Sequence, residues 1–253
     1  MKIPITALIL LLPWAGFAAP LHVLMLSGAN NHDWRATTPV LKKILEADGR
    51  FLVDVETNVP GMRPDAFANY DVVLSNFNTF GQTNFDTVWH APMRAAFVDF
   101  IHHGHGLVIV HAGSSAFYNC PEFQQLAGAV WGPGTEHGRI HMDQIHIVSP
   151  EHPVTAGVED FPTIDEFWQD THIKPTAKPL ATVTPLKEFG GSGKPEPIAF
   201  ATELYGGRGF TLLLGHDTRA MKSEGFQNLL RRGTEWAATG KVSSAPAGPT
   251  KAK

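Results

Sequence analysis

Short apolar runs alternate with longer amphipathic segments through the first half of the chain. Residues 22–26, 51–55, 70–75 and 107–110 are apolar and short enough to be buried strands. Two segments between them, residues 37–49 and 91–103, place apolar side chains at helical spacing and end at glycines. In the first of these segments, Thr37, Thr38 and Pro39 supply a predicted cap and first turn. Such alternation predicts a parallel sheet with helices on both faces.

The second half of the chain has a different pattern. Residues 142–148, 180–184, 198–202 and 210–214 are predicted strands, and loops rich in proline and glycine separate them with little helix between. We interpret these strands as an antiparallel extension of the same sheet. A final helix over residues 225–238 closes the domain.

Both ends of the chain differ from this pattern. Residues 1–18 combine an early lysine, an apolar run and a small-residue stretch, which is the layout of a signal peptide, with cleavage expected after Ala18. Export would place the mature protein in the periplasm or outside the cell. Residues 19–240 then form one domain, and residues 241–253, rich in serine, alanine, proline and glycine, are expected to be a disordered tail.

Composition narrows the class of partner. The formal net charge is −4 and no basic run precedes the tail, so the chain lacks the electrostatic signature of a nucleic-acid-binding protein. No stretch after the leader reaches the length of a membrane span. The single cysteine, Cys120, forms no internal disulfide and does not identify a redox compartment. We therefore expect a neutral small molecule as the partner.

Three predicted strands end at a histidine. His32 follows the first strand, His111 follows residues 107–110, and His216 follows residues 210–214. Ligands of open α/β sheets bind at the carboxyl ends of parallel strands, so these histidines are expected to face one crevice. Thirteen histidines are many for this length, and loop histidines on a rigid scaffold are candidates for function.

The turn after residues 107–110 has the small residues of a nucleophile elbow, but its central position falls at about Ala112, which has no reactive atom. Ser114 or Ser115, activated by His111 or His216, would make a serine hydrolase. The other interpretation is a flexible loop whose hydroxyl groups bond to the backbone.

The histidines allow two kinds of chemistry. His32, His111 and His216 would form a mixed nitrogen and oxygen site for a divalent metal together with a carboxylate such as Glu166. Alternatively, imidazoles act as acids, bases or hydrogen-bond donors to a sugar. A second pair, His137 and His141, would share a face if helical, but the glycines around it favour a loop.

Aromatic residues beside these loops suggest a sugar ligand, since flat rings suit the apolar face of a pyranose. The same rings would equally fill the core under long loops. The predicted substrate-binding residues are Asn30, His32, Asp33, Trp34, Ser114, Trp131 and Trp168. The predicted catalytic residues are His111, Glu166, His216 and Asp217, the last of which could simply orient His216.

Four motifs together resemble the ThuA-like, or trehalose-utilisation, family. They are residues 28–34, residues 110–113, residues 152–157 followed by 165–168, and residues 215–217. The resemblance implies a flavodoxin-like, three-layer α/β sandwich of the class I glutamine amidotransferase-like type and a link to carbohydrate catabolism. Amidotransferases of that superfamily carry a cysteine at the elbow and a late His-Pro-Glu motif. The corresponding late motif here is His216-Asp217-Thr218, so glutamine hydrolysis is not expected.

The resemblance also implies a substrate class. We expect an exported enzyme that acts on a sugar or a 3-keto-sugar derivative by elimination, hydration or hydrolysis, with a partner sugar dehydrogenase that supplies the ketone. A non-catalytic sugar-binding module that retains the fold is the alternative. Neither nicotinamide nor flavin is expected, and the chain has no Gly-x-Gly-x-x-Gly motif.

Overall fold

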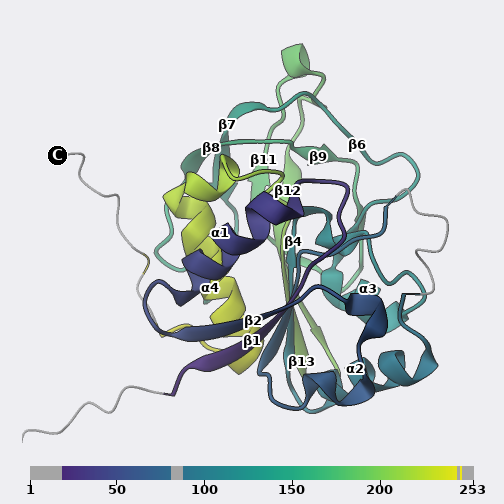
Figure 1. The fold of residues 1–253 in the computed structure, drawn as a ribbon. Helices are drawn as coiled ribbons and strands as arrows, with labels where there is room; N and C mark the ends of the chain where they lie inside the picture. Colours follow the sequence, from purple (N-terminus) through teal and green to yellow (C-terminus); the bar gives the residue numbers. More distant parts are fainter. Residues whose placement is uncertain (1–18, 81–87, 244–245, 247–253) are drawn as a thin grey trace, which may run out of the picture.

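A nine-stranded mixed sheet forms the centre of the computed structural model, which describes residues 19–80, 88–243 and 246 (Figure 1). The strand order is β2-β1-β3-β4-β13-β12-β11-β7-β8. Residues 1–18, predicted to be a signal peptide, and most of residues 241–253 lie outside the described part of the chain.

One half of the sheet is parallel, as the β-α alternation predicts. Its strands are β1 (Leu21–Leu26), β2 (Phe51–Glu56), β3 (Val72–Ser75), β4 (Gly106–Val110) and β13 (Gly207–Leu212). The order β2-β1-β3-β4 is that of flavodoxin-like folds, in which the strand order reverses beside β1. The carboxyl ends of β1, β4 and β13 therefore lie at the same edge.

Helices cover both faces of this parallel half (Figure 1). One layer contains α1 (Trp34–Glu46) and α4 (Glu224–Thr239), and the other contains α2 (Ala91–His102) and α3 (Pro121–Ala127). Alternate residues of β1 pack into the two cores, because successive side chains of a strand point to opposite faces of the sheet. Val23 and Met25 pack with α1, whereas Leu24 and Leu26 pack with α2. Each helix of the described residues is too short or too polar to cross a lipid bilayer.

The antiparallel extension is also present. It consists of β12 (Glu196–Leu204), β11 (Lys178–Val183), β7 (His141–Ile147) and β8 (Phe161–Asp165). The strand predicted over residues 210–214 belongs to both halves: β13 pairs in antiparallel fashion with β12, as predicted, and in parallel with β4, so it joins the two halves. That parallel pairing brings the end of β13 beside the end of β4.

Helix α1 begins earlier than its sequence signals predict. The side chain of Asp33 caps it by accepting a hydrogen bond from the Ala36 N–H at 3.1 Å, and Pro39 lies inside the helix. Thr38, expected to be part of the cap, is buried, and its hydroxyl lies 2.7 Å from that of Ser27. An aspartate at the N-cap satisfies a free backbone donor, which explains the earlier start.

Candidate functional site

The chain turns sharply at His111, immediately after β4. The φ angle of His111 is +47°, in the left-handed region that residues other than glycine seldom adopt. His111, and not Ala112 as predicted, therefore occupies the elbow. Two residues on, a Cβ atom on Gly113 would clash with the backbone carbonyl of Ser75, so the tight turn requires glycine there.

The imidazole of His111 has a defined orientation. Its Nδ1 lies 2.7 Å from the carbonyl oxygen of Leu213, which can only accept, so Nδ1 carries the proton. Its Nε2 lies 3.7 Å from Glu166 Oε1. This nitrogen is buried, with no hydrogen-bond partner within the described part of the chain. The elbow therefore presents Nε2 to the interior of the site.

A network of asparagines orients His32 in the loop after β1. Asn30 Oδ1 accepts hydrogen bonds from the backbone N–H of His32 at 2.9 Å and from its Nδ1 at 3.0 Å. The side-chain amide of Asn78 donates to the same oxygen at 2.9 Å. Nε2 of His32 is thereby left free for the site. Asn30, one of the predicted substrate-binding residues, positions His32 in this structure.

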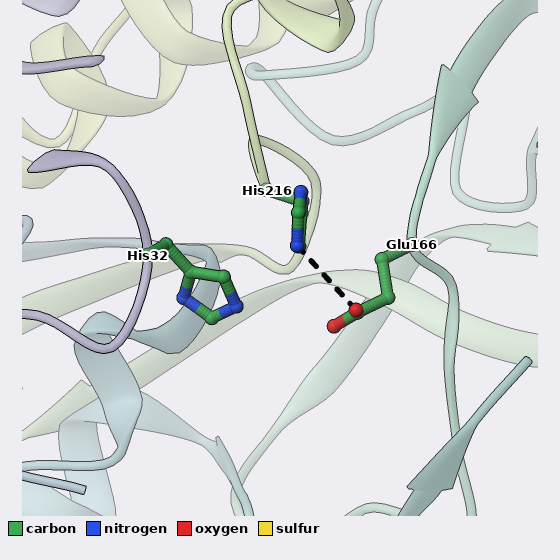
Figure 2. A group of neighbouring side chains, drawn as sticks. All are labelled: His32, Glu166 and His216. Atoms are coloured by element: carbon green, nitrogen blue, oxygen red, sulfur yellow. Dashed lines mark ion pairs between the residues drawn. The ribbon is translucent and has the colours of Figure 1, made fainter. Parts of the chain in front are cut away.

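Asp165, at the end of β8, fixes the loop that follows β13. Its carboxylate accepts hydrogen bonds from the backbone N–H groups of Gly215 at 2.6 Å and His216 at 3.1 Å. The next residue, Glu166, extends toward the imidazole of His216, and Oε2 lies 3.5 Å from Nε2 (Figure 2). A buried carboxylate thus holds the backbone on which the catalytic candidate His216 stands.

His137 joins the site although it is absent from the predicted set. It belongs to β6 (Glu136–His137), which pairs with β9 (Trp168–Gln169), and its Nδ1 lies 3.3 Å from Glu166 Oε2. His141 points elsewhere: it is buried and stacks on Phe189 with 4.5 Å between ring centroids. The four-residue spacing makes both His137 and His141 candidates. The pairing of β6 with β9 shows that His137 is the one that faces Glu166.

These groups surround a cavity of about 270 Å³. It is lined by Asn31, His32, Phe80, Ala112, Ser115, Trp131, His137, Glu166, Trp168 and His216. Trp131 and Trp168 meet edge to face, with centroids 4.9 Å apart, and Trp168 also contacts His111. The structure therefore brings together six of the predicted residues, which are His32, His111, Trp131, Glu166, Trp168 and His216.

Besides Asn30, four other predicted residues do not line this cavity. Asp33 caps α1, and Trp34 packs against the guanidinium group of Arg35, 4.2 Å from the ring centroid. Ser114 is buried beneath the elbow, whereas the neighbouring Ser115 reaches the cavity. Asp217 forms an ion pair with Arg219 at 2.5 Å, and its Oδ2 lies 3.6 Å from Nδ1 of His216, beyond hydrogen-bond distance.

A family model and several solved structures are similar to this chain. The family model described as "ThuA: Trehalose utilisation" matches residues 22–237. The chain belongs to the ThuA family. A putative ThuA-like protein from Parabacteroides merdae is 32% identical, with a TM-score of 0.79 over 89% of this chain and 92% of that one. Another from Bacteroides uniformis is 20% identical, with a TM-score of 0.60 over 93% and 98% of the two chains.

A more distant solved structure has the same fold as this ThuA-family domain. A putative GMP synthase protein from Thermoplasma acidophilum is 11% identical, with a TM-score of 0.53 over 88% of this chain and 96% of that one. At this identity the likeness shows the fold alone. It agrees with the predicted glutamine amidotransferase-like class. No match was found among curated proteins.

In the ThuA-family site, the histidines and Glu166 shift one another's pKa values. Burial raises the pKa of Glu166, but the imidazoles of His111, His137 and His216 outweigh it and lower this pKa to about 2. Burial, with the charges of His111 and His216, lowers the pKa of His32 to about 3. Burial and the charge of His111 also lower the pKa of His216. Both rings are therefore neutral at pH 7.

The pKa of His111 moves in the opposite direction. Burial is the largest influence and lowers it, but Glu166, the charge of Asp165 and the bond to Leu213 together raise the pKa above its usual value. Burial raises the pKa of Asp165 to about 6 despite its three backbone hydrogen bonds and the charge of His111. Environments that push neighbouring pKa values apart are typical of acid–base pairs. The pKa of His111 is thus raised beside two histidines whose pKa values are lowered, His216 and His32.

The same side chains fit a divalent cation. His32, Glu166 and His216 each offer a ligand atom, and these atoms lie within 4.8 Å of one another (Figure 2). The Nδ1 atom of His32 is held by Asn30, which leaves Nε2 as a lone-pair donor in the manner of metal-binding histidines. Two imidazoles and one carboxylate form a ligand set that zinc accepts while keeping a position open.

Proposed function

We propose that this ThuA-family protein is an exported enzyme that acts by acid–base chemistry on a small carbohydrate, namely a 3-keto-sugar derivative. The observation that carries the proposal is the cluster of four imidazoles around Glu166 at the wall of an aromatic cavity. The elbow there holds an imidazole, not a thiol or hydroxyl group. Export rests on the sequence of residues 1–18 alone.

The proposed chemistry begins at the carbon next to the ketone. A carbonyl at C3 makes the C2 proton acidic, and the neutral imidazole of His216 accepts it. His111, protonated and fixed by Leu213, donates a hydrogen bond to the carbonyl oxygen as negative charge develops there. The electron pair of the C2–H bond forms a C1=C2 bond, and the C1–O bond breaks. The departing oxygen takes the proton that His216 accepted, and water adds to the double bond afterwards, with its oxygen at C1 and a proton at C2.

The aromatic residues give this reaction its binding surface. Trp131, Trp168 and Phe80 line the cavity together with polar groups, a combination that suits the amphipathic faces of a sugar ring. A cation held by His32, Glu166 and His216 would instead supply Lewis-acid polarisation of the ketone oxygen, and His216 would then be a ligand and not the base. A sugar dehydrogenase would act earlier, because the C3 alcohol must be oxidised before the C2 proton becomes acidic.

Turnover of a purified 3-keto-glucoside tests the proposal. We expect the wild-type protein to release the C1 substituent, and His111→Asn, Glu166→Gln and His216→Asn each to slow release about 10²- to 10⁴-fold. His103→Gln, at the exposed C-terminal end of α2, is the matched control and should retain full activity. Equal turnover by all variants would refute the roles assigned here. Sugar binding without turnover by the wild type would instead identify a binding module.

A further inference from the structure

We propose that Asn78, a buried residue outside the cavity lining, is a positioning residue that holds His32 in the Nδ1–H tautomer. This inference rests on the proposed function, because His32 belongs to the same site. Asn78 lies in the loop after β3, and its side chain is fully buried. Its amide bonds directly to two residues that line the cavity, Asn31 and Phe80, and reaches a third, His32, through Asn30.

The side-chain amide of Asn78 uses all of its hydrogen-bonding capacity. Oδ1 accepts from the backbone N–H groups of Asn31 at 3.3 Å and Phe80 at 3.2 Å. Nδ2 donates to Oδ1 of Asn30 and to Oδ1 of Asn31, each at 2.9 Å. An amide has two N–H donors and two oxygen lone pairs, so each of them has a partner. Because backbone N–H groups can only donate, the orientation of this amide is fixed.

Asn78 also joins the loop after β1 to the loop after β3. Its backbone N–H donates to the carbonyl oxygen of Ala29 at 3.0 Å. In the other direction, Nδ2 of Asn30 donates to the carbonyl oxygen of Asn76 at 3.1 Å. The two strands are parallel neighbours, so both loops lie at the edge of the sheet that carries the site. Asn30 is thus held between the two loops.

Oδ1 of Asn30 passes this orientation on to His32. It accepts from Nδ2 of Asn78 and from the backbone N–H of His32 at 2.9 Å, and it lies 3.0 Å from Nδ1 of the same histidine. Since the first two partners are donors, this oxygen is an acceptor, and Nδ1 must carry the ring proton. Nε2 then keeps its lone pair, the form in which a histidine accepts a proton or binds a metal ion. Asn78 therefore acts on the site through Asn30.

Asn78→Asp tests this role with little change of shape. The carboxylate still accepts from the N–H groups of Asn31 and Phe80, but it places an oxygen where Nδ2 donated to Asn30. Two oxygens would then face each other, so we expect Asn30 to move away from His32 and both tautomers of the ring to be populated. Nitrogen-15 NMR of metal-free protein with labelled histidines measures the tautomer at pH 7, and His32→Asn assigns the signals. The wild type should show the Nδ1–H tautomer alone.

Asn76→Asp is the matched control. Asn76 is buried in the same loop, and its Nδ2 donates to the hydroxyl groups of Thr37 at 3.1 Å and Thr38 at 3.0 Å. A hydroxyl group can donate to a carboxylate as readily as it accepts from an amide, so the new charge meets no opposing acceptor. We expect this variant to keep the wild-type tautomer of His32.

Zinc affinity provides a second readout. In calorimetry after removal of metal, Asn78→Asp should bind zinc about tenfold more weakly than the wild type, and Asn76→Asp should bind it as the wild type does. If Asn78→Asp does not fold, Asn78→Ala, which removes the amide and adds no charge, should also show both tautomers of His32.

Three results would overturn the positioning role. They are a wild-type His32 with its proton on Nε2, an unchanged tautomer in the folded Asn78 variants, and an equal change in Asn76→Asp. None of these measurements depends on turnover. A wild type with the expected spectrum that leaves 3-keto-glucosides intact would therefore refute the proposed function and not the role of Asn78. An active wild type whose Asn78→Asp variant keeps the wild-type spectrum would refute the role of Asn78 alone.

Discussion

The Nδ1–H group of His111 donates a hydrogen bond to the carbonyl oxygen of Leu213, 2.7 Å away. The bond joins the ends of β4 and β13, two neighbouring parallel strands. It sets the tautomer of an imidazole whose backbone is in the left-handed region, and it leaves Nε2 facing Glu166. This hydrogen bond therefore links the pairing of two strands to the orientation of the His111 ring.

Substitutions of His111 should separate its backbone role from its chemical role. Asparagine tolerates a positive φ, so His111→Asn should fold with stability near that of the wild type. Valine is branched at Cβ, and His111→Val should lose about 1–3 kcal/mol of unfolding free energy through strain. Urea denaturation followed by circular dichroism measures both variants. Equal stability of the two would show that the elbow conformation is not constrained.

Asp165→Asn should weaken the connection between β8 and the loop after β13. The carboxylate accepts from both Gly215 and His216, and an amide offers only one acceptor atom, so a buried N–H group loses its partner. We expect a loss of about 1–3 kcal/mol in urea denaturation. Glu159→Gln, at an exposed carboxylate, is a control for removing one negative charge. A stable Asp165→Asn variant would contradict the positioning role.

Zinc binding should depend on Asn30 as well as on the three ligands. After removal of metal with a chelator, calorimetry should show one zinc ion bound per chain, and Glu166→Gln should weaken it. Asn30→Ala should lower zinc affinity about 10- to 100-fold, because the Nδ1 group of His32 loses its acceptor. His146→Gln, an exposed histidine paired with Asp160, should bind as the wild type does. Unchanged affinity in Asn30→Ala would refute this orientation of His32.

The strand ends were predictable from sequence because buried parallel strands appear as short apolar runs. That pattern placed His32, His111 and His216 at one edge, where they do meet, with ring centroids 4.6–5.5 Å apart. His137 was not predictable, since its position depends on the pairing of two-residue strands β6 and β9. The elbow was predicted at about Ala112 and lies at His111, because a positive φ at a histidine has no signature in the sequence.

Stability should fall in acid partly because of His152. Burial lowers its pKa to about 4, with a smaller contribution from Lys178, and its Nδ1 accepts a hydrogen bond from the Val154 N–H at 3.3 Å. The unfolded chain binds this proton near pH 6.5, so the contribution is complete above that pH and is lost as the pH falls toward 4.

The comparison of His152→Gln with the wild type isolates this effect. Because the ring is half-buried and solvent screens its charge, we expect only about 1 kcal/mol between pH 7.5 and 4.5, well below full conversion of the pKa shift. Thermal unfolding across that range should show a shallower pH dependence in His152→Gln. Parallel curves for the two proteins would contradict the lowered pKa.

Exchange of the C2 proton of a 3-keto-glucoside in D₂O, followed by proton NMR, tests the central claim most directly. The wild-type protein should speed loss of the C2 signal or release of the C1 substituent with deuterium at C2, and His216→Asn and Glu166→Gln should slow it at least about 10²-fold. A wild-type protein that binds the sugar yet leaves its C2 proton exchanging at the uncatalysed rate, with no release at C1, would contradict the account.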